Sequence, residues 1–295
     1  MFRVVVAGAG PWGRILIKNI LGAPDYELAG VVSRNSETPK LVPTSTQVAG
    51  DLKTITVPYD GLVVATPPEV HADLLRQGLA KRVPVFVEKP LALSLNETEQ
   101  IHAVISAANA AVMVDHIHLF NPAYEQLRSK ALDEGVCSIE SVGGGPGPFR
   151  SYSALWDYGP HDLAVCFDLM GSPPLAVSAV QAHRANGGLS VQAVLHFSHD
   201  RTARVRFGNN FERKIRTTKV LTRKGNTYLF DDIANKTQNA MVATPLQNSV
   251  VPTPLQNALA IFRDDHILRE DRRWGTGHAL EIARALDGIE RQLPN

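Results

Sequence analysis

Three glycines near the start of the chain have the spacing of a loop that holds a phosphate-bearing cofactor. The loop follows the apolar run Phe2–Ala7 directly and reads Gly8-Ala9-Gly10-Pro11-Trp12-Gly13. Glycine lets the backbone turn tightly and approach a pyrophosphate, which then lies at the positive end of the following helix. The spacing alone is a weak signal, since a glycine-rich turn is the structural alternative. Its strand–loop–helix setting favours a bound dinucleotide, with Trp12 packed beside it.

The end of the second predicted strand bears on which dinucleotide is bound. NAD-specific folds carry an acidic residue about 20 residues further on, for the ribose 2′-hydroxyl. This chain has Ser33-Arg34-Asn35 there instead. A guanidinium pairs with a phosphate through two hydrogen bonds, so Arg34 together with Ser33 favours NADP(H). NAD(H) stays possible, because Arg34 is alternatively a solvated loop residue.

A lysine lies at the predicted carboxyl end of a later strand. Lys89 stands between Glu88 and Pro90. The carboxyl ends of parallel strands face the crevice in which open α/β sheets bind ligands. There the ammonium group of Lys89 can hydrogen-bond a substrate oxygen or lower the pKa of a neighbouring group.

An aspartate and a histidine are spaced so that both can take part in one proton transfer. Asp157 and His161 are four positions apart and share one face if a helix begins near Tyr158, with Pro160 tolerated in its first turn. A histidine that titrates near neutrality can pass a proton to an oxygen as hydride arrives at the carbon. The alternative is that His161 caps the helix or is buried for structural reasons. Asp162 is expected to stabilise the first helical turn.

Two pairs of histidines could be interpreted as metal ligands. They are His116 with His118, and His196 with His199. Neither pair has carboxylate or cysteine companions at ligand spacing, and alternate histidines on strands are common. No metal site is therefore predicted.

The elements expected to position these residues alternate between strand and helix. Apolar runs predict strands at 2–7, 26–33, 61–66, 83–87 and 112–114, and helical periodicity predicts helices at 14–21, 69–79 and 96–108. Such alternation indicates right-handed βαβ units on a parallel sheet. Between residues 35 and 57, Pro39 and Pro43 predict a short or absent helix.

Beyond about residue 119, several strands follow one another. A helix is expected at 121–134, and strands at 138–142, 176–183, 190–196, 203–207, 215–222 and 226–230. Gly187-Gly188 and His199-Asp200 predict hairpin turns, and Gly143–Pro148 a flexible or turning loop. A C-terminal helix is expected at 278–293. The fold class is thus an α/β Rossmann domain at 1–118, followed at 119–295 by an α+β domain with a large, mostly antiparallel open-faced sheet. The last helix is able to pack back on the first domain.

Composition and charge narrow the possible partners. The formal net charge is +1 and no long basic run occurs, which gives no electrostatic case for nucleic acid or an anionic membrane. No apolar run reaches the roughly 18–20 residues of a membrane span. The start lacks the apolar core of a signal peptide, and Cys137 and Cys166 are too far apart in sequence to suggest a disulfide framework. A soluble, cytoplasmic protein is expected.

Four further segments, with the glycine loop, resemble the glucose–fructose oxidoreductase/inositol dehydrogenase family, Gfo/Idh/MocA. Their order and spacing are similar to the family's over nearly the whole chain. They are Ala65-Thr66-Pro67-Pro68 with His71; Glu88-Lys89-Pro90; Val114-Asp115-His116 leading to Phe120-Asn121-Pro122-Ala123; and Trp156-Asp157-Tyr158-Gly159-Pro160-His161-Asp162.

The resemblance implies a role for many of these residues. The nicotinamide would lie in a cleft between the domains, and the turn Thr66-Pro67-Pro68, with His71 and Glu88, would line the cofactor pocket. Lys89 matches the family's active-site lysine, and Asp157 and His161 its substrate-binding and acid/base pair. Further candidate substrate contacts are His116, Arg150 and Trp156; the segment from Arg150 through Tyr152 to Trp156 is equally a packed loop with an exposed arginine.

The function expected on this basis is an NAD(P)-dependent oxidoreductase. It would transfer hydride between nicotinamide and a hydroxyl or carbonyl carbon of a sugar, cyclitol or sugar-nucleotide, with lysine and histidine assisting the proton. Two alternatives stay open: a non-catalytic dinucleotide-binding sensor, and a reductase of a non-sugar C=N or C=C bond. The family usually covers its open sheet face by pairing, so a homodimer or homotetramer is expected.

Overall fold

The computed structural model describes residues 1–185, 187–234, 251–264 and 272–293. The chain forms two compact units, each with its own sheet. The first unit comprises Met1–Asp115 with Leu255–Leu280, and the second comprises His116–Pro254 with Glu281–Asn295.

The first unit is built on six parallel strands. In sequence they are β1 (Phe2–Ala7), β2 (Tyr26–Val32), β3 (Gln47–Ala49), β4 (Gly61–Val64), β5 (Val85–Glu88) and β6 (Val112–Asp115). Their order in the sheet is β3-β2-β1-β4-β5-β6, and every neighbouring pair is parallel. The strand order reverses direction between β1 and β4, which is where doubly wound sheets bind dinucleotides. The predicted Rossmann fold is confirmed.

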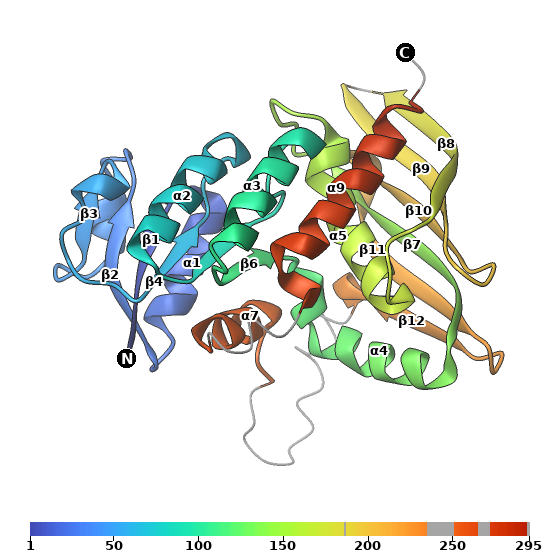
Figure 1. Cartoon of the computed structure of the whole chain (residues 1–295), viewed down its shortest axis with the longest axis horizontal. Helices are drawn as coiled ribbons and strands as arrows, with labels where there is room; N and C mark the ends of the chain where they lie inside the picture. Colours follow the sequence, from blue (N-terminus) through green and yellow to red (C-terminus); the bar gives the residue numbers. More distant parts are fainter. Residues whose placement is uncertain (186, 235–250, 265–271, 294–295) are drawn as a thin grey trace. The chain divides into compact units, whose positions relative to one another are not determined.

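Three helices of this unit lie close to their predicted positions. They are α1 (Pro11–Leu21), α2 (His71–Lys81) and α3 (Leu95–Ala107), which Figure 1 shows alongside the strands. Helix α1 begins three residues earlier than predicted, because Pro11 is compatible with a first helical position and Gly10 serves as N-cap. Alternate strand residues such as Val5, Val64 and Val87 form a core with Leu75 of α2 and Ile101 of α3.

The segment between residues 35 and 57 has no α-helix, as its prolines predicted. It contains only the 3-10 turns η1 (Thr38–Leu41) and η2 (Leu52–Thr54), on either side of β3. Strand β3 itself was not predicted. Its three residues, flanked by turns, are too short to give a periodic pattern.

A helix from late in the sequence completes the first unit and was also missed. Helix α7 spans Pro254–Arg263. Its Phe262 is fully buried and meets the rings of Phe2 and Phe86 edge to face, with centroids 5.8 and 5.6 Å away. The Tyr26 hydroxyl donates a hydrogen bond to the carbonyl oxygen of Leu259 at 2.5 Å.

The second unit is built on a mixed, mostly antiparallel sheet, as predicted. Its order is β12-β11-β7-β10-β9-β8. Among the described strand pairs of this second sheet, only β7–β10 is parallel. The strands are β7 (Val136–Pro146), β8 (Ala176–Ala185), β9 (Gly188–His196), β10 (Thr202–Gly208), β11 (Asn210–Thr222) and β12 (Thr227–Asp231). The predicted turn between β9 and β10 has positive φ at both His199 and Asp200, as a tight hairpin requires.

The prediction of a loop at Gly143–Pro148 was wrong in its first half. Strand β7 continues through Gly143 and Gly144 to Pro146. A Cβ atom at Gly143 would lie 2.2 Å from Asp162 Oδ2, and one at Gly144 2.3 Å from the Phe211 ring. These glycines are therefore sites of close packing within a strand, which a local pattern does not distinguish from a turn.

Three longer helices of the described residues belong wholly or partly to the second unit. They are α4 (Pro122–Glu134), α5 (Ala154–Met170) and α9 (Thr276–Glu290). Helix α5 packs against β7, β9 and β10, and Figure 1 shows it on one side of the sheet. It begins four residues before the predicted start, with Ser153 as N-cap, so Pro160 lies inside it. The placement of Asp162 in the first turn was consequently wrong; its carboxyl is buried in the helix middle and accepts a hydrogen bond from Ser141 at 2.7 Å.

Candidate functional site

The glycine loop joins β1 to α1 under tight steric limits. Gly8 has φ of +105°, and a Cβ atom there would lie 2.5 Å from the carbonyl oxygen of Ala65. A Cβ at Gly13 would lie 2.1 Å from the carbonyl oxygen of Gly8. The first and third glycines are therefore required by the chain's own packing.

Gly10 differs from its two neighbours in the motif. An added Cβ would meet nothing within 4 Å, although φ is an ordinary −68°. Gly10 is also the N-cap of α1, and no side chain caps the helix or places a negative charge in its first turn. The loop thus leaves open space beside uncapped backbone N–H groups at the positive end of a helix. This cradle fits the pyrophosphate of a dinucleotide.

The residues predicted to select the dinucleotide follow β2. Ser33 Oγ accepts hydrogen bonds from the Asn35 backbone N–H at 3.1 Å and from the Thr38 hydroxyl at 2.8 Å. Arg34 is exposed to solvent. The turn is therefore held by Ser33, while the Arg34 guanidinium is accessible to an anion.

A buried histidine ties together the segments that follow β4 and β5. His71 is inaccessible to solvent, with Nδ1 3.1 Å from the Pro90 carbonyl oxygen and Nε2 3.0 Å from that of Thr66. Burial lowers its pKa, which favours the neutral ring, so one nitrogen donates to one of these oxygens and the other nitrogen only contacts the second. His71 thus positions the Thr66-Pro67-Pro68 turn and the Glu88-Lys89-Pro90 segment relative to each other. Its ring offers no surface to a ligand.

The carboxyl ends of β5 and β6 bring two acids together. Glu88 lies opposite Asp115 in the parallel register of these strands. Trp12 Nε1, from the glycine loop, donates a hydrogen bond to Glu88 Oε1. Asp115 is 1% exposed, and neither of its oxygens receives a hydrogen bond from an N–H or O–H group among the described residues. A proton shared with Glu88 would satisfy both carboxyl groups.

The electrostatics of this acid pair agree with a shared proton. Desolvation raises the pKa of Glu88 well above its usual range, and the Asp115 charge raises it further. Desolvation likewise raises the pKa of Asp115. The adjacent Lys89 opposes the rise in both, since its positive charge favours the carboxylate forms.

In the second unit, Asp157 and His161 are four residues apart on α5. Asp157 is 6% exposed, and the Arg150 Nε atom lies 3.5 Å from its Oδ2. His161 is partly exposed. Residues at this spacing lie on one face of a helix. The two side chains thus stand next to each other along α5, as their spacing predicted.

A second histidine and a distant aspartate extend this group. The rings of His118 and His161 meet edge to face, with centroids 5.0 Å apart. His118 Nδ1 lies 4.0 Å from Asp232 Oδ1, and Asn121 Nδ2 donates to the same oxygen at 3.2 Å. Sequence reasoning considered His118 only as a metal ligand and did not single out Asp232. Because the two residues are far apart in the chain, no local pattern could have joined them.

The other candidate substrate contacts differ in accessibility. Trp156 is 4% exposed and donates a hydrogen bond to Glu290 Oε2 at 3.1 Å. His116 is 2% exposed. Arg150, by contrast, is exposed and lines a pocket of about 240 Å³. Only Arg150 of these three has substantial surface to offer a ligand.

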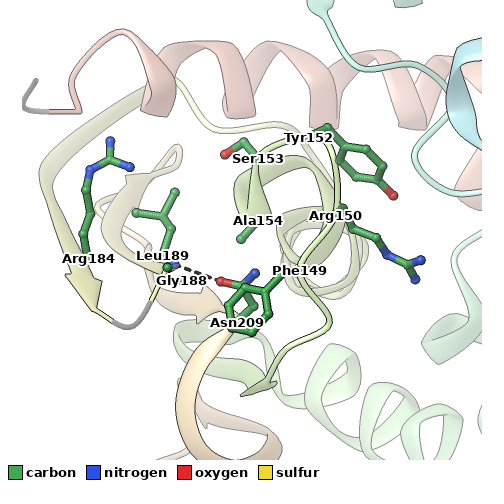
Figure 2. A pocket seen from close by; sticks show the side chains of 10 residues that line it. Phe149, Arg150, Tyr152, Ser153, Ala154, Arg184, Gly188, Leu189 and Asn209 are labelled. Carbon is green, nitrogen blue, oxygen red and sulfur yellow. Dashed lines mark hydrogen bonds between the residues drawn. The ribbon is translucent and has the colours of Figure 1, made fainter.

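The pocket lies between the segment before α5 and the β8–β9 hairpin. Figure 2 shows Arg150 and Arg184 on opposite sides of it, with Ser153 between them. Asn209 fixes one wall, accepting from the Leu189 N–H at 2.8 Å and donating to the Pro148 carbonyl at 3.1 Å. Two arginines and no carboxylate occur among the described lining residues. The pocket therefore suits a polar or anionic group.

The described residues also bear on two other classes of site. No three histidine, cysteine, aspartate or glutamate side chains there lie close enough together to hold a metal ion. Within the same residues, none of the helices combines the length and the apolar character that crossing a membrane requires.

A protein-family model matches the first unit. Residues 2–116 fit the model of the GFO_IDH_MocA oxidoreductase family, described as an NAD-binding Rossmann fold. The family resemblance drawn from the motifs is thus confirmed over these residues.

Individual relatives extend the similarity. An inositol 2-dehydrogenase of Rhizobium meliloti is 26% identical over 195 residues, which cover 61% of this chain and 58% of that protein. A UDP-N-acetylglucosamine 3-dehydrogenase of Acidithiobacillus ferrooxidans is 25% identical over 191 residues, 60% of this chain and 57% of that protein. The chain therefore matches less than two thirds of these relatives' lengths. A crystal structure of a candidate oxidoreductase from Magnetospirillum magnetotacticum MS-1 superposes with a TM-score of 0.82 at 28% identity, covering 97% of this chain and 99% of the other.

Proposed function

Since residues 2–116 match the model of the Gfo/Idh/MocA oxidoreductase family, we propose that this chain is an NAD(P)-dependent oxidoreductase. It would move a hydride between a nicotinamide and a hydroxyl or carbonyl carbon of a small polar substrate. The bound dinucleotide supplies the hydride acceptor or donor.

The observation that carries this proposal is the open cradle at Gly10. Gly8 and Gly13 are required by packing, whereas Gly10 borders empty space beside the uncapped start of α1. The cradle follows β1 at the point where the strand order reverses. A glycine-rich turn with a purely structural role would not need a backbone N–H cluster left open in this position.

We assign the proton transfer to side chains of this chain. Lys89, at the end of β5, would hydrogen-bond the substrate oxygen. His161 would give a proton to that oxygen, or take one from it, as the carbon–oxygen bond of the substrate changes between single and double. Asp157 would orient the substrate hydroxyl beside His161, with Arg150 holding the Asp157 carboxylate.

The substrate class follows from the relatives and from the pocket in the second unit. The two relatives named above act on inositol and on a UDP-linked sugar, according to their names. The pocket beside Arg150 is polar and has two arginines, which suits a hydroxylated or phosphorylated ligand. A sugar, cyclitol or sugar-nucleotide is the substrate that these observations favour.

NADP(H) is proposed as the preferred cofactor. Arg34 is exposed beside the turn held by Ser33, and β2 is followed by Ser33-Arg34-Asn35 rather than by an acidic residue that could take a ribose hydroxyl. One charge-assisted hydrogen bond contributes roughly 1.5–3 kcal/mol, so Arg34→Ala should weaken NADPH binding by about 10- to 100-fold. NADH binding should change little.

The test is a titration of the wild type and of Arg34→Ala with NADPH and NADH, followed by turnover assays. Inositols and UDP-sugars form one substrate panel, imines and conjugated C=C compounds another. Turnover on the first panel that is lost in Lys89→Met and His161→Asn supports the proposal. Turnover on the second panel alone identifies the non-sugar reductase instead. Tight dinucleotide binding with no turnover identifies a sensor, and binding of neither dinucleotide contradicts all three.

A further inference from the structure

Three elements of the first unit converge on one carboxyl pair. Glu88 ends β5, Asp115 ends β6, and Trp12 lies in the first turn of α1. The parallel register places Glu88 directly opposite Asp115. The Trp12 indole N–H donates to the Glu88 carboxyl. The contacts thus run from the carboxyl end of β6, through β5, into the glycine loop.

A proton between the two acids accounts for this arrangement. Asp115 is almost completely buried, and among the described residues no donor reaches either of its oxygens. Two neighbouring carboxylates in a desolvated site would repel each other strongly. With one proton shared, the pair is held by a charge-assisted hydrogen bond, and Glu88 Oε1 is directed at Trp12.

We propose that Asp115 and Glu88 share one proton and thereby act as positioning residues, holding Trp12 and the glycine loop in the form that binds a dinucleotide. The inference rests on the proposed function, because it gives the pair a task in cofactor binding. Neither acid touches the reacting atoms in this scheme.

Charge balance explains why the proton matters for binding. With one proton present, the single negative charge of the pair offsets the positive charge of Lys89, the residue next to Glu88. Loss of the proton adds a second negative charge near a loop that is to receive an anionic pyrophosphate. It also separates Glu88 from Asp115 and so releases Trp12. Dinucleotide affinity should therefore fall as the pH rises through the loss of this proton.

The first test is made without any dinucleotide. Infrared spectra of the wild type at neutral pH should contain a protonated-carboxyl band that is absent from both Glu88→Gln and Asp115→Asn. The control is Glu27→Gln, which removes an exposed carboxylate of β2 in the same unit. A band that persists unchanged in Glu88→Gln and Asp115→Asn overturns the shared proton.

The link to the glycine loop is also tested on the free protein. Trp12 emission is obtained as the difference between the wild type and Trp12→Phe. It should change with pH as the pair loses its proton, and this change should be absent in Asp115→Asn. Emission from Trp12 that responds to pH equally in both proteins overturns the link.

The second test measures affinity for NADPH and NADH by calorimetry across the same pH range. Asp115→Ala removes the hydrogen-bond partner of the Glu88 carboxyl and should weaken binding about tenfold. Asp115→Asn keeps an oxygen that can accept from Glu88, so it should retain the affinity and lose the pH dependence. The double variant Trp12→Phe/Asp115→Ala should bind no more weakly than either single variant, because both break the same chain of contacts. Fully additive losses overturn the proposal.

These outcomes separate this inference from the proposed function. A wild type that binds neither dinucleotide, yet shows the carboxyl band and the coupled Trp12 response, contradicts the oxidoreductase assignment and leaves the shared proton standing. A wild type that binds NADPH and turns over substrate, with Asp115→Ala unchanged in affinity and pH profile, contradicts the positioning role alone.

Discussion

Gly10 and Gly13 belong to one loop, yet a methyl group at the two positions should have different consequences. At Gly10 the added Cβ enters open space, so Gly10→Ala should fold normally. It should weaken dinucleotide binding by about tenfold or more, because the methyl group occupies the space proposed for a phosphate and costs at least one hydrogen bond. At Gly13 the Cβ would lie 2.1 Å from a backbone oxygen, so Gly13→Ala should lower the stability of the unit itself.

Thermal unfolding and calorimetric titration of the two variants check this pair of expectations. Gly10→Ala should retain the wild-type melting temperature, while Gly13→Ala should lose several degrees. If Gly10→Ala binds the dinucleotide as tightly as the wild type, the cradle is not the phosphate site.

The pKa shifts of Glu88 and Asp115 also predict how stability varies with pH. Both pKa values are raised in the folded protein, so the folded state binds more protons than the unfolded chain above the ordinary carboxyl range. The stabilisation is complete below the unfolded pKa values and is lost as the pH rises through the folded ones. One extra bound proton corresponds to a decline of up to about 1.4 kcal/mol per pH unit.

Urea denaturation between about pH 5 and pH 8 measures this decline. The wild type should become less stable across the range, and the decline should be shallower in Glu88→Gln and Asp115→Asn. Parallel stability curves for the three proteins would show that the pair titrates alike in the folded and unfolded states.

Single residues differ in how far the sequence could predict their roles. The glycine loop, Arg34 and Lys89 could be selected as candidates from the sequence, because their neighbours in sequence define their setting. The Glu88–Asp115 pair depends on the register of two strands, and the His118–Asp232 contact joins a 3-10 turn to the residue directly after β12, more than 100 residues away. Such pairings are properties of the folded chain, so motif reading cannot supply them.

At the scale of elements, α4 and α5 are tied by one buried carboxylate. Asp168 on α5 accepts hydrogen bonds from the Tyr124 hydroxyl at 2.5 Å and from Arg128 Nε at 2.7 Å, both on α4. The Asp168 side chain is 2% exposed. Asp168→Ala would leave the buried Tyr124 hydroxyl and the partly exposed Arg128 guanidinium without their acceptor, and we expect a loss of about 3–5 kcal/mol in the free energy of unfolding.

A matched variant on α4 provides the comparison. Asp133 pairs with Lys224 at 3.6 Å, and both side chains are largely exposed. Asp133→Ala should cost less than about 1 kcal/mol, because exposed ion pairs contribute little. Equal losses in the two variants would mean that burial does not determine the strength of the α4–α5 tie.

The sequence predicted most elements and misjudged those whose boundaries depend on tertiary packing. Apolar periodicity found five of the six strands of the first sheet and its three helices. The predicted end of β7 was too early, because the glycines that make room for the side chains of Asp162 and Phe211 have the sequence pattern of a turn. It began α5 too late, because a proline inside a buried helix looks like a proline in a first turn. Helix α7 was missed although Leu255, Leu259 and Phe262 have helical spacing.

For the whole molecule we predict a homodimer or homotetramer. Buried and exposed residues alternate along β10. Its exposed residues Arg204 and Arg206 lie on the face of the second sheet opposite the buried ones. Arg204 stands beside Glu140 of β7, which in turn stands beside Lys219 of β11. Association through such a charged face should weaken as salt is added, because exposed charges are screened.

Light scattering at low and high salt tests the assembly. A species larger than 32.1 kDa that shrinks on addition of salt agrees with the prediction. A 32.1 kDa species alone at micromolar concentration removes it.

The division of the first unit between two stretches of chain sets an order for its synthesis. Its sheet is complete at Asp115, but α7, which covers Phe2 and Phe86, follows about 140 residues later. Translation proceeds at roughly 5–20 residues per second, so these aromatic surfaces stay uncovered for several seconds or more after the sheet emerges. During that interval the newborn sheet offers chaperones an apolar surface that the finished protein no longer has. The unit proposed to bind the dinucleotide thus cannot be completed until α7 has left the ribosome.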